Sequence, residues 1–148
     1  MLGQVENLPK AVAECVRVLK PGAHMLVFNT FAGELLEPRE ADRLYRALSI
    51  VPENMSPTHA EEVFAGAGLQ VVQREVVSSE WREHDIGNGN QQALRDLLTI
   101  ARLLRNETEL VAEFGSMRYE IALANAMWWP FQLSGKLTPQ VFLLHKVD

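Results

Sequence analysis

Residues 8–28 read LPKAVAECVRVLKPGAHMLVF, and this stretch decides the fold. Its first half carries apolar residues at helical spacing, and it follows Asn7, a residue type that caps helices. Pro21 cannot continue a helix, and Gly22 has the backbone freedom that a sharp reversal needs. Met25–Phe28 is apolar without alternation, as in a strand buried on both faces of a parallel sheet. The stretch therefore predicts a helix, a turn and a buried strand of an α/β protein.

The same residues carry a family resemblance. A helix that runs into Arg17-Val18-Leu19-Lys20-Pro21-Gly22 and then into a hydrophobic strand resembles the late half of class I S-adenosylmethionine-dependent methyltransferases. The resemblance implies a partial Rossmann-like α/β fold with about three core strands, the last one antiparallel and between the other two. It also implies helices around the sheet and a helical cap inserted at about residues 90–133. The alternative to this family is any other α/β protein that contains a helix–Pro-Gly–strand unit.

Length and composition are those of an ordinary globular protein. The 148 residues suffice for one domain with a core, and 47% are hydrophobic and 22% charged. The net charge of −5 argues against nucleic-acid binding, which needs a basic face. We see no apolar run long enough to span a membrane and no export signal, so we expect a cytoplasmic protein. The single cysteine, Cys15, lies on the apolar face of the first predicted helix and is expected to be a core residue.

The resemblance covers nearly the whole chain, whereas the chain covers only about half of the family's fold. Residues 1–8 resemble the end of the fourth strand and the loop after it. The glycine-rich turn and the ribose-binding acidic residue, which the family places upstream, are therefore not expected here. Gly87-Asn88-Gly89-Asn90 is the one glycine-rich candidate, but the stretch before it is too polar for a central strand, so a loop is predicted. We expect no cofactor-binding residue, although S-adenosylmethionine is the family's cofactor.

Two segments after the predicted strands carry candidate site residues. Loops at the carboxyl ends of parallel strands hold ligands, so a substrate contact from Asn29, Thr30 or Phe31 is predicted; a turn with a packed phenylalanine is the alternative. The run SSEWREHD at 78–85 resembles a stretch at the mouth of the active site in bacterial small-molecule methyltransferases. That resemblance implies that Glu80 or His84 orients or deprotonates the acceptor and that Trp81 forms an aromatic wall. The alternative is a solvated strand end.

The rest of the chain alternates predicted helices and strands. We predict helices at Glu34–Ile50 and from Ser56 or Thr58 to Gly68, a strand at Leu69–Val77, helices from Gln91 to about Leu133, and a last strand at Gln140–Lys146. A leucine stripe from Leu94 to Leu104 is predicted as the buried side of the first of these late helices. Trp128 and Trp129 belong to an aromatic cluster that either lines an apolar substrate pocket or packs in the core. No histidine has a second metal ligand at helical spacing, so no metal site is predicted.

Three functions remain open from the sequence. The first is the substrate-side half of a small-molecule methyltransferase, inactive as an isolated chain. The second is a non-catalytic small-ligand-binding module, and the third is an oligomeric interaction protein that kept the fold. Because a methyltransferase sheet cut after its fourth strand leaves strand 23–28 with a free apolar edge, we also predict a homo-oligomer through that edge or the first helix.

Overall fold

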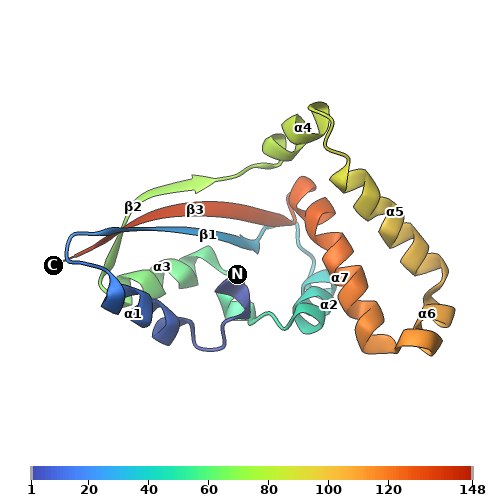
Figure 1. Cartoon of the computed structure of the whole chain (residues 1–148), viewed down its shortest axis with the longest axis horizontal. Coiled ribbons are helices and arrows are strands. Elements are labelled where there is room, and N and C mark those ends of the chain that lie inside the picture. Colours follow the sequence, from blue (N-terminus) through green and yellow to red (C-terminus); the bar gives the residue numbers. More distant parts are fainter. Residues whose placement is uncertain (1, 148) are drawn as a thin grey trace. The chain divides into compact units, whose positions relative to one another are not determined.

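The computed structural model describes residues 2–147 as a mixed α/β chain of short helices and three strands (Figure 1). The elements are η1 (Leu2–Gln4), α1 (Leu8–Val18), β1 (His24–Ala32), α2 (Pro38–Leu48), η2 (Pro52–Met55), α3 (Pro57–Gly66), β2 (Leu69–Val76), α4 (Ser79–Gly87), α5 (Gln92–Arg105), α6 (Glu107–Phe114), α7 (Ser116–Leu133) and β3 (Leu137–Lys146). They form two compact units. We call residues 2–32, 50–77 and 138–147 the sheet unit and residues 33–49 and 78–137 the helical unit. Within residues 2–147, no helix is long and apolar enough to cross a bilayer.

The sheet has the strand order β1-β3-β2, which confirms the predicted placement of the last strand between the other two. β3 runs antiparallel to β2, with Leu69 opposite Lys146 and Val76 opposite Gln140. β1 is also antiparallel to β3. The Lys146 N–H, at the end of β3, donates to the Ala23 carbonyl, just before β1, at 2.9 Å, and the Gly33 N–H, just after β1, donates to the Lys136 carbonyl, just before β3, at 2.8 Å. β1 therefore lies at an edge of the sheet.

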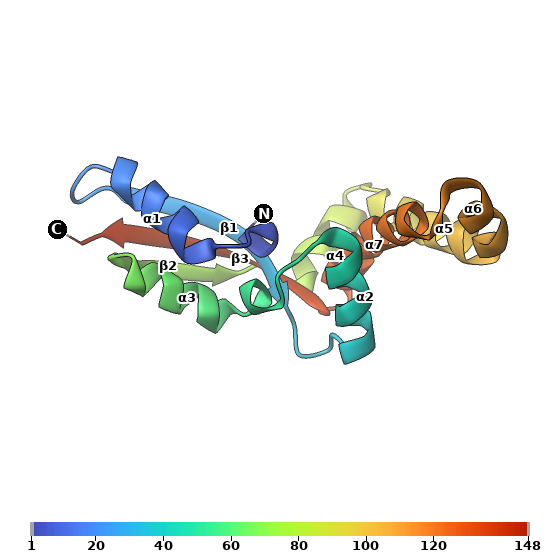
Figure 2. The ribbon, with the colours of Figure 1, turned by 90° about the horizontal axis from the view of Figure 1, so that it is seen from below.

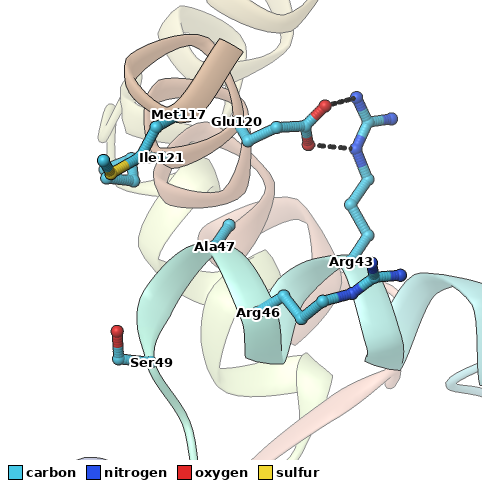
Figure 3. A pocket seen from close by; sticks show the side chains of 7 residues that line it. All are labelled: Arg43, Arg46, Ala47, Ser49, Met117, Glu120 and Ile121. Carbon is cyan, nitrogen blue, oxygen red and sulfur yellow. Dashed lines mark hydrogen bonds and ion pairs between the residues drawn. The ribbon is translucent and has the colours of Figure 1, made fainter.

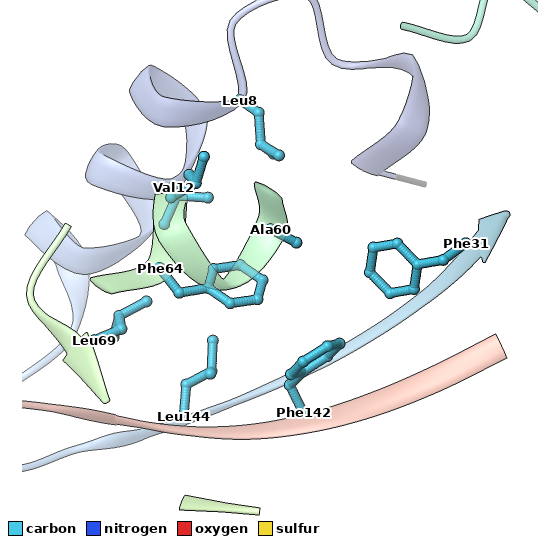
Figure 4. Close-up of a cluster of buried hydrophobic side chains, with 9 residues drawn as sticks. Leu8, Val12, Phe31, Ala60, Phe64, Leu69, Phe142 and Leu144 are labelled. Atoms are coloured by element: carbon cyan, nitrogen blue, oxygen red, sulfur yellow. The ribbon is translucent and has the colours of Figure 1, made fainter. Parts of the chain in front are cut away.

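Helices α1 and α3 pack on one face of the sheet and close the core of the sheet unit (Figures 1 and 2). The core cluster, drawn in Figure 4, consists of Leu8, Val12, Phe31, Ala60, Val63, Phe64, Leu69, Phe142 and Leu144. Phe142 of β3 is fully buried and meets the rings of Phe31 and Phe64 edge-on, at centroid distances of 5.9 Å and 5.6 Å. The predicted apolar faces of α1 and α3 are confirmed, except that Cys15 is exposed and is not a core residue.

The prediction of a strand buried on both faces is wrong for β1. Met25 and Val27 pack against the core, whereas Leu26 is 69% exposed and Phe28 is 59% exposed on the opposite face. Among the described residues, no helix of the core cluster covers that opposite face of the sheet. The side chains of β1 that point to it are therefore exposed to solvent, although the run is apolar throughout. The strand also continues to Ala32, so the loop predicted after Phe28 is part of β1.

Local signals explain the boundaries of α2 and α3. Glu37 forms a capping box with Glu40, and α2 begins at Pro38 rather than at Glu34, because proline fits the first helical turn. It ends where Ser49 adopts a left-handed conformation with φ of 53°. Ser56, not Thr58, caps α3: its side chain accepts a hydrogen bond from the His59 N–H at 3.3 Å.

The helical unit differs from the sequence expectation in three places. The polar run 78–85 is not a strand end: Ser78 precedes helix α4, and the rest of the run lies in that helix. Gly87 is the last residue of α4, and a short loop follows it, in the region where a loop was predicted. The helical stretch predicted from Gln91 to about Leu133 is also broken at Gly115, which has φ of 85° and separates α6 from α7. Finally, the leucine stripe of α5 is exposed, because α5 buries Ala93 on its other side.

Candidate functional site

The candidate site is a pocket of about 460 Å³ in the helical unit, between α2 and α7 (Figure 3). Its lining residues are Arg43, Arg46, Ala47, Ser49, Met117, Glu120 and Ile121. Pockets of about 300–1,000 Å³ hold small organic ligands. The volume therefore suits a small-molecule ligand.

One side of the pocket is an ion pair with two hydrogen bonds. Arg43 Nε donates to Glu120 Oε2 at 2.6 Å, and Arg43 Nη2 donates to Glu120 Oε1 at 2.9 Å. The guanidinium lowers the pKa of Glu120, and the carboxylate raises the pKa of Arg43. Both side chains remain more than a third exposed, so they can still meet a ligand.

The other side of the pocket is apolar. Figure 3 shows Met117 and Ile121 of α7 away from the ion pair, with Ala47 of α2 below them. Tyr119, which precedes Glu120 on α7, is buried close to Arg43, and its hydroxyl makes no hydrogen bond of good geometry among the described residues. Burial raises the pKa of the Tyr119 hydroxyl. The pocket thus offers charges of both signs beside an apolar wall, an arrangement that suits a small amphipathic or zwitterionic molecule.

Arg43→Met is expected to lower the free energy of unfolding by about 1 kcal/mol or less at pH 7, because the pair is partly exposed and screened. Since Arg43 lowers the pKa of Glu120, the contribution is complete above the carboxyl's unfolded pKa. It is lost as the pH falls through the lowered folded value. Denaturant unfolding across this pH range checks it, with Arg39→Met on the exposed face of α2 as the matched control. If the difference in unfolding free energy between the two variants grew as the pH fell, the contribution assigned to the Arg43–Glu120 pair would be contradicted.

A second polar contact joins α4 to α7. The Arg82 guanidinium lies over the ring of Trp129, 4.3 Å from its centroid, and Arg82 Nη2 donates to Gln132 Oε1 at 2.5 Å. Gln132 is buried, and Arg82 Nε is buried without a partner among the described residues. The run 78–85, which was predicted to hold the reactive groups, is therefore anchored by Arg82, a residue that was not among the predicted site residues.

The predicted site residues of that run lie on the outside of α4. Glu80 and His84 are exposed, and Trp81 is 64% exposed. His84 Nε2 lies 2.9 Å from Asn88 Nδ2, at the end of the same helix. Trp128 and Trp129 are half-buried near the end of α7, the helix that α4 contacts. The structure therefore brings Trp129 and the α4 run into one helical unit, and roles in substrate binding or proton transfer remain predictions.

The two other predicted substrate contacts belong to the sheet unit. Phe31 is fully buried in the core against Phe142, the packing role that was its alternative. Asn29 is also buried: its Oδ1 accepts a hydrogen bond from the Leu2 N–H at 3.2 Å, and its Nδ2 has no partner among the described residues. Contacts of these two residues with a substrate remain predictions.

The grouping of possible metal ligands and the connections after β1 and β2 show which cofactor sites the described residues fit. Among residues 2–147, no three histidine, cysteine or acidic side chains are grouped so that they could hold a metal ion. Dinucleotide-type cofactors sit on a glycine-rich turn between a strand and a helix. Here β2 is joined to α4 by Val77 and Ser78, and the segment from β1 to α2 has one glycine, Gly33. These two connections do not fit that kind of cofactor site.

Sequence reasoning missed Arg43, Glu120 and Tyr119. The partner of Arg43 lies 77 residues away in the chain. No local spacing could reveal such a pair. The one usable signal was Glu120 itself, because it is the single acidic residue in the largely apolar stretch 119–131.

Neither a family model nor a curated protein matches the sequence. Solved structures do match. A candidate sarcosine dimethylglycine methyltransferase from Galdieria sulphuraria superposes with a TM-score of 0.59 at 15% identity, over 99% of this chain and 50% of its own. Phosphoethanolamine N-methyltransferase 2 from Haemonchus contortus, in complex with phosphomonomethylethanolamine and S-adenosylhomocysteine, matches with a TM-score of 0.56 at 16% identity, over 99% and 32%. MccD protein matches with a TM-score of 0.56 at 12% identity, over 98% and 56%.

The chain thus spans between a third and just over half the length of these structures. At such identities the likeness concerns the fold. The chain has the fold of class I S-adenosylmethionine-dependent methyltransferases over about half of their length, as the helix–Lys-Pro-Gly–strand motif predicted.

Proposed function

We propose that this chain is the substrate-side half of a small-molecule methyltransferase and that its helical unit binds the methyl acceptor. The observation that carries the proposal is the pocket between α2 and α7, in a chain that superposes over almost its whole length on methyltransferases. Arg43 and Glu120 give this pocket both a cationic and an anionic group. It is therefore suited to an acceptor that itself carries an amine and an acid group.

The matched structures point to the same chemistry. One is named for sarcosine and dimethylglycine, and another was solved with phosphomonomethylethanolamine. Each of these molecules combines an amine with a carboxylate or a phosphate. We propose that this chain's acceptor belongs to that class. Trp81, Trp128 and Trp129 do not line the α2–α7 pocket, so aromatic walls from them are a proposal separate from that pocket.

Methyl transfer is an in-line displacement, so most of the catalytic effect comes from holding the acceptor in the reactive orientation. The part we assign to this chain is to bind and orient the acceptor. Glu80 and His84 lie exposed on α4, outside the α2–α7 pocket, so a part for either in orienting the acceptor or taking up its proton is a separate proposal. We propose that S-adenosylmethionine is held by a part of the fold that these residues do not supply, so the isolated chain is inactive.

Calorimetry on the isolated chain tests the proposal. Sarcosine, dimethylglycine and phosphomonomethylethanolamine are titrated as acceptors, and S-adenosylmethionine is titrated separately. We expect saturable binding of at least one acceptor and none of S-adenosylmethionine. Glu120→Gln should weaken acceptor binding by about tenfold, since one charge-assisted contact is worth about 1.4 kcal/mol or more, whereas Arg39→Met should not.

Two results would contradict the proposal. If none of the three acceptors binds, the pocket is not an acceptor site of this class. Micromolar binding of S-adenosylmethionine by the chain alone would show that the cofactor does not need another part of the fold.

A second candidate function is a non-catalytic or oligomeric module, and the edge strand favours it. β1 has a free edge and exposes Leu26 and Phe28, so another strand can pair with it. We propose that a second copy of the chain does so, in the cytoplasm, and that this pairing occurs in either function.

A further inference from the structure

Helix α5 carries an exposed apolar stripe that the proposed acceptor site does not use. Leu94, Leu97, Leu98 and Leu104 are each about half exposed, and exposed Ala101 completes the spacing of one helix face. Contiguous exposed apolar residues of this kind mark an interaction surface rather than ordinary solvent-exposed positions. We call these five residues the α5 stripe.

Opposite charges border the stripe. α5 carries Arg95, Arg102 and Arg105 against a single Asp96, whereas the sequence of α6 is ETELVAEF, with three glutamates and no basic residue. These arginines and the glutamates Glu107, Glu109 and Glu113 are all exposed. In the described chain, none of the six is in an ion pair, although five other ion pairs are formed. The region thus offers a basic helix and an acidic helix in succession along the chain, with no ion pair between them; Glu107 alone also acts electrostatically on Arg43.

We propose that the α5 stripe is the centre of a twofold interface with a second copy of this chain. In such an interface each copy presents the same surface, so a patch must complement itself. An antiparallel pair of α5 helices brings the leucines together. It also brings α6, which begins two residues after α5 ends, toward the N-terminal half of the partner's α5. There the glutamates meet Arg95 and the positive end of the helix dipole.

Charge selects a second copy over a lipid surface. Basic amphipathic helices bind anionic membranes, and the α5 stripe with its arginines has part of that pattern. The three glutamates of α6 and the net charge of −5 would be repelled by the same membrane. Against a second copy, the glutamates of α6 meet Arg95 and the positive end of the partner's α5.

A charge-swap experiment tests this interface independently of acceptor binding. The background variant is Leu26→Pro, which blocks the edge of β1. The basic helix is reversed with Arg95→Glu, Arg102→Glu and Arg105→Glu in one protein, and the acidic helix with Glu107→Lys, Glu109→Lys and Glu113→Lys in another. Mass is measured by light scattering and sedimentation, and folding by circular dichroism. All six positions are exposed; if a triple variant does not fold, Arg95→Glu and Glu109→Lys replace the two sets.

The background should be a dimer, and each reversed protein alone should dissociate at least about tenfold more readily, because like charges then face each other. Equal amounts of the two reversed proteins should form a heterodimer, since the reversed helices complement each other. A monomeric background overturns the proposal, as do reversed proteins that self-associate normally or a mixture that stays dissociated. Binding of the background to phosphatidylserine vesicles without dimerisation would overturn it in favour of the membrane.

Discussion

Phe142→Ala is expected to lower the free energy of unfolding by about 3–5 kcal/mol, the range for a large aromatic side chain removed from a packed core. Phe142 is fully buried in the central strand β3 and contacts the rings of Phe31 and Phe64 edge-on. Its loss removes both ring contacts and leaves a cavity between β3 and α3. Because domains of this size are stable by only about 5–15 kcal/mol, the variant should be close to unfolding at room temperature.

The matched control is Phe28→Ala, on β1 of the same unit. Phe28 is 59% exposed on the uncovered face of the sheet, so its removal should cost about 1 kcal/mol or less. Both variants are compared by urea unfolding at a protein concentration too low for dimers. Equal losses for the two phenylalanines would show that the sheet unit does not have the core described here.

The parts of the fold set by local chemistry were predictable from the sequence. Asn7, Pro21 and Gly22 define the ends of α1 and the turn into β1, and the structure has α1 at Leu8–Val18 as expected. Helix α3 and strand β2 follow from a serine cap, a glycine stop and β-branched residues. The strand order came from the family resemblance, since nothing in the spacing of β3 states which neighbours it takes.

Exposure could not be read from residue type. Leu26 and Phe28 are as apolar as Met25 and Val27, yet only the second pair packs against the core. The same holds for the leucines of α5 and for Cys15, since an apolar pattern states which side of an element is apolar, not what covers it. The Arg43–Glu120 pair was equally out of reach because it depends on how α2 and α7 pack.

Below the free edge of β1 is a groove of about 300 Å³. It lies between β1 and α1, and its lining includes Ala11, Cys15, Met25 and Val27. When a peptide adds to a sheet edge, main-chain hydrogen bonds supply affinity, and alternate side chains of the added strand enter such a groove. The groove thus explains why Cys15 is exposed within an otherwise apolar face.

Leu26→Pro is therefore expected to abolish pairing at this edge while leaving the fold intact. Ala23 is hydrogen-bonded to Lys146, and Gly33 donates to the Lys136 carbonyl at 2.8 Å, so the backbone of every second residue between them faces β3. Leu26 is one of the alternate residues between them, so its N–H points away from β3, toward the open edge of the sheet. Proline there removes a donor that only an added strand would use, and the extended conformation of Met25 is the one that a following proline requires.

Val27→Pro is the opposing control, because the Val27 N–H lies on the side that faces β3. This variant should lose about 3 kcal/mol or more of stability, since it breaks a ladder hydrogen bond.

Sedimentation at several concentrations measures the association, with the two charge-reversed α5 and α6 proteins as backgrounds in which only the β1 edge can pair. There Leu26→Pro should convert dimers to monomers without a change in the unfolding midpoint. Dimers that persist in Leu26→Pro, or a destabilisation equal to that of Val27→Pro, would show that β1 does not present the edge assigned to it.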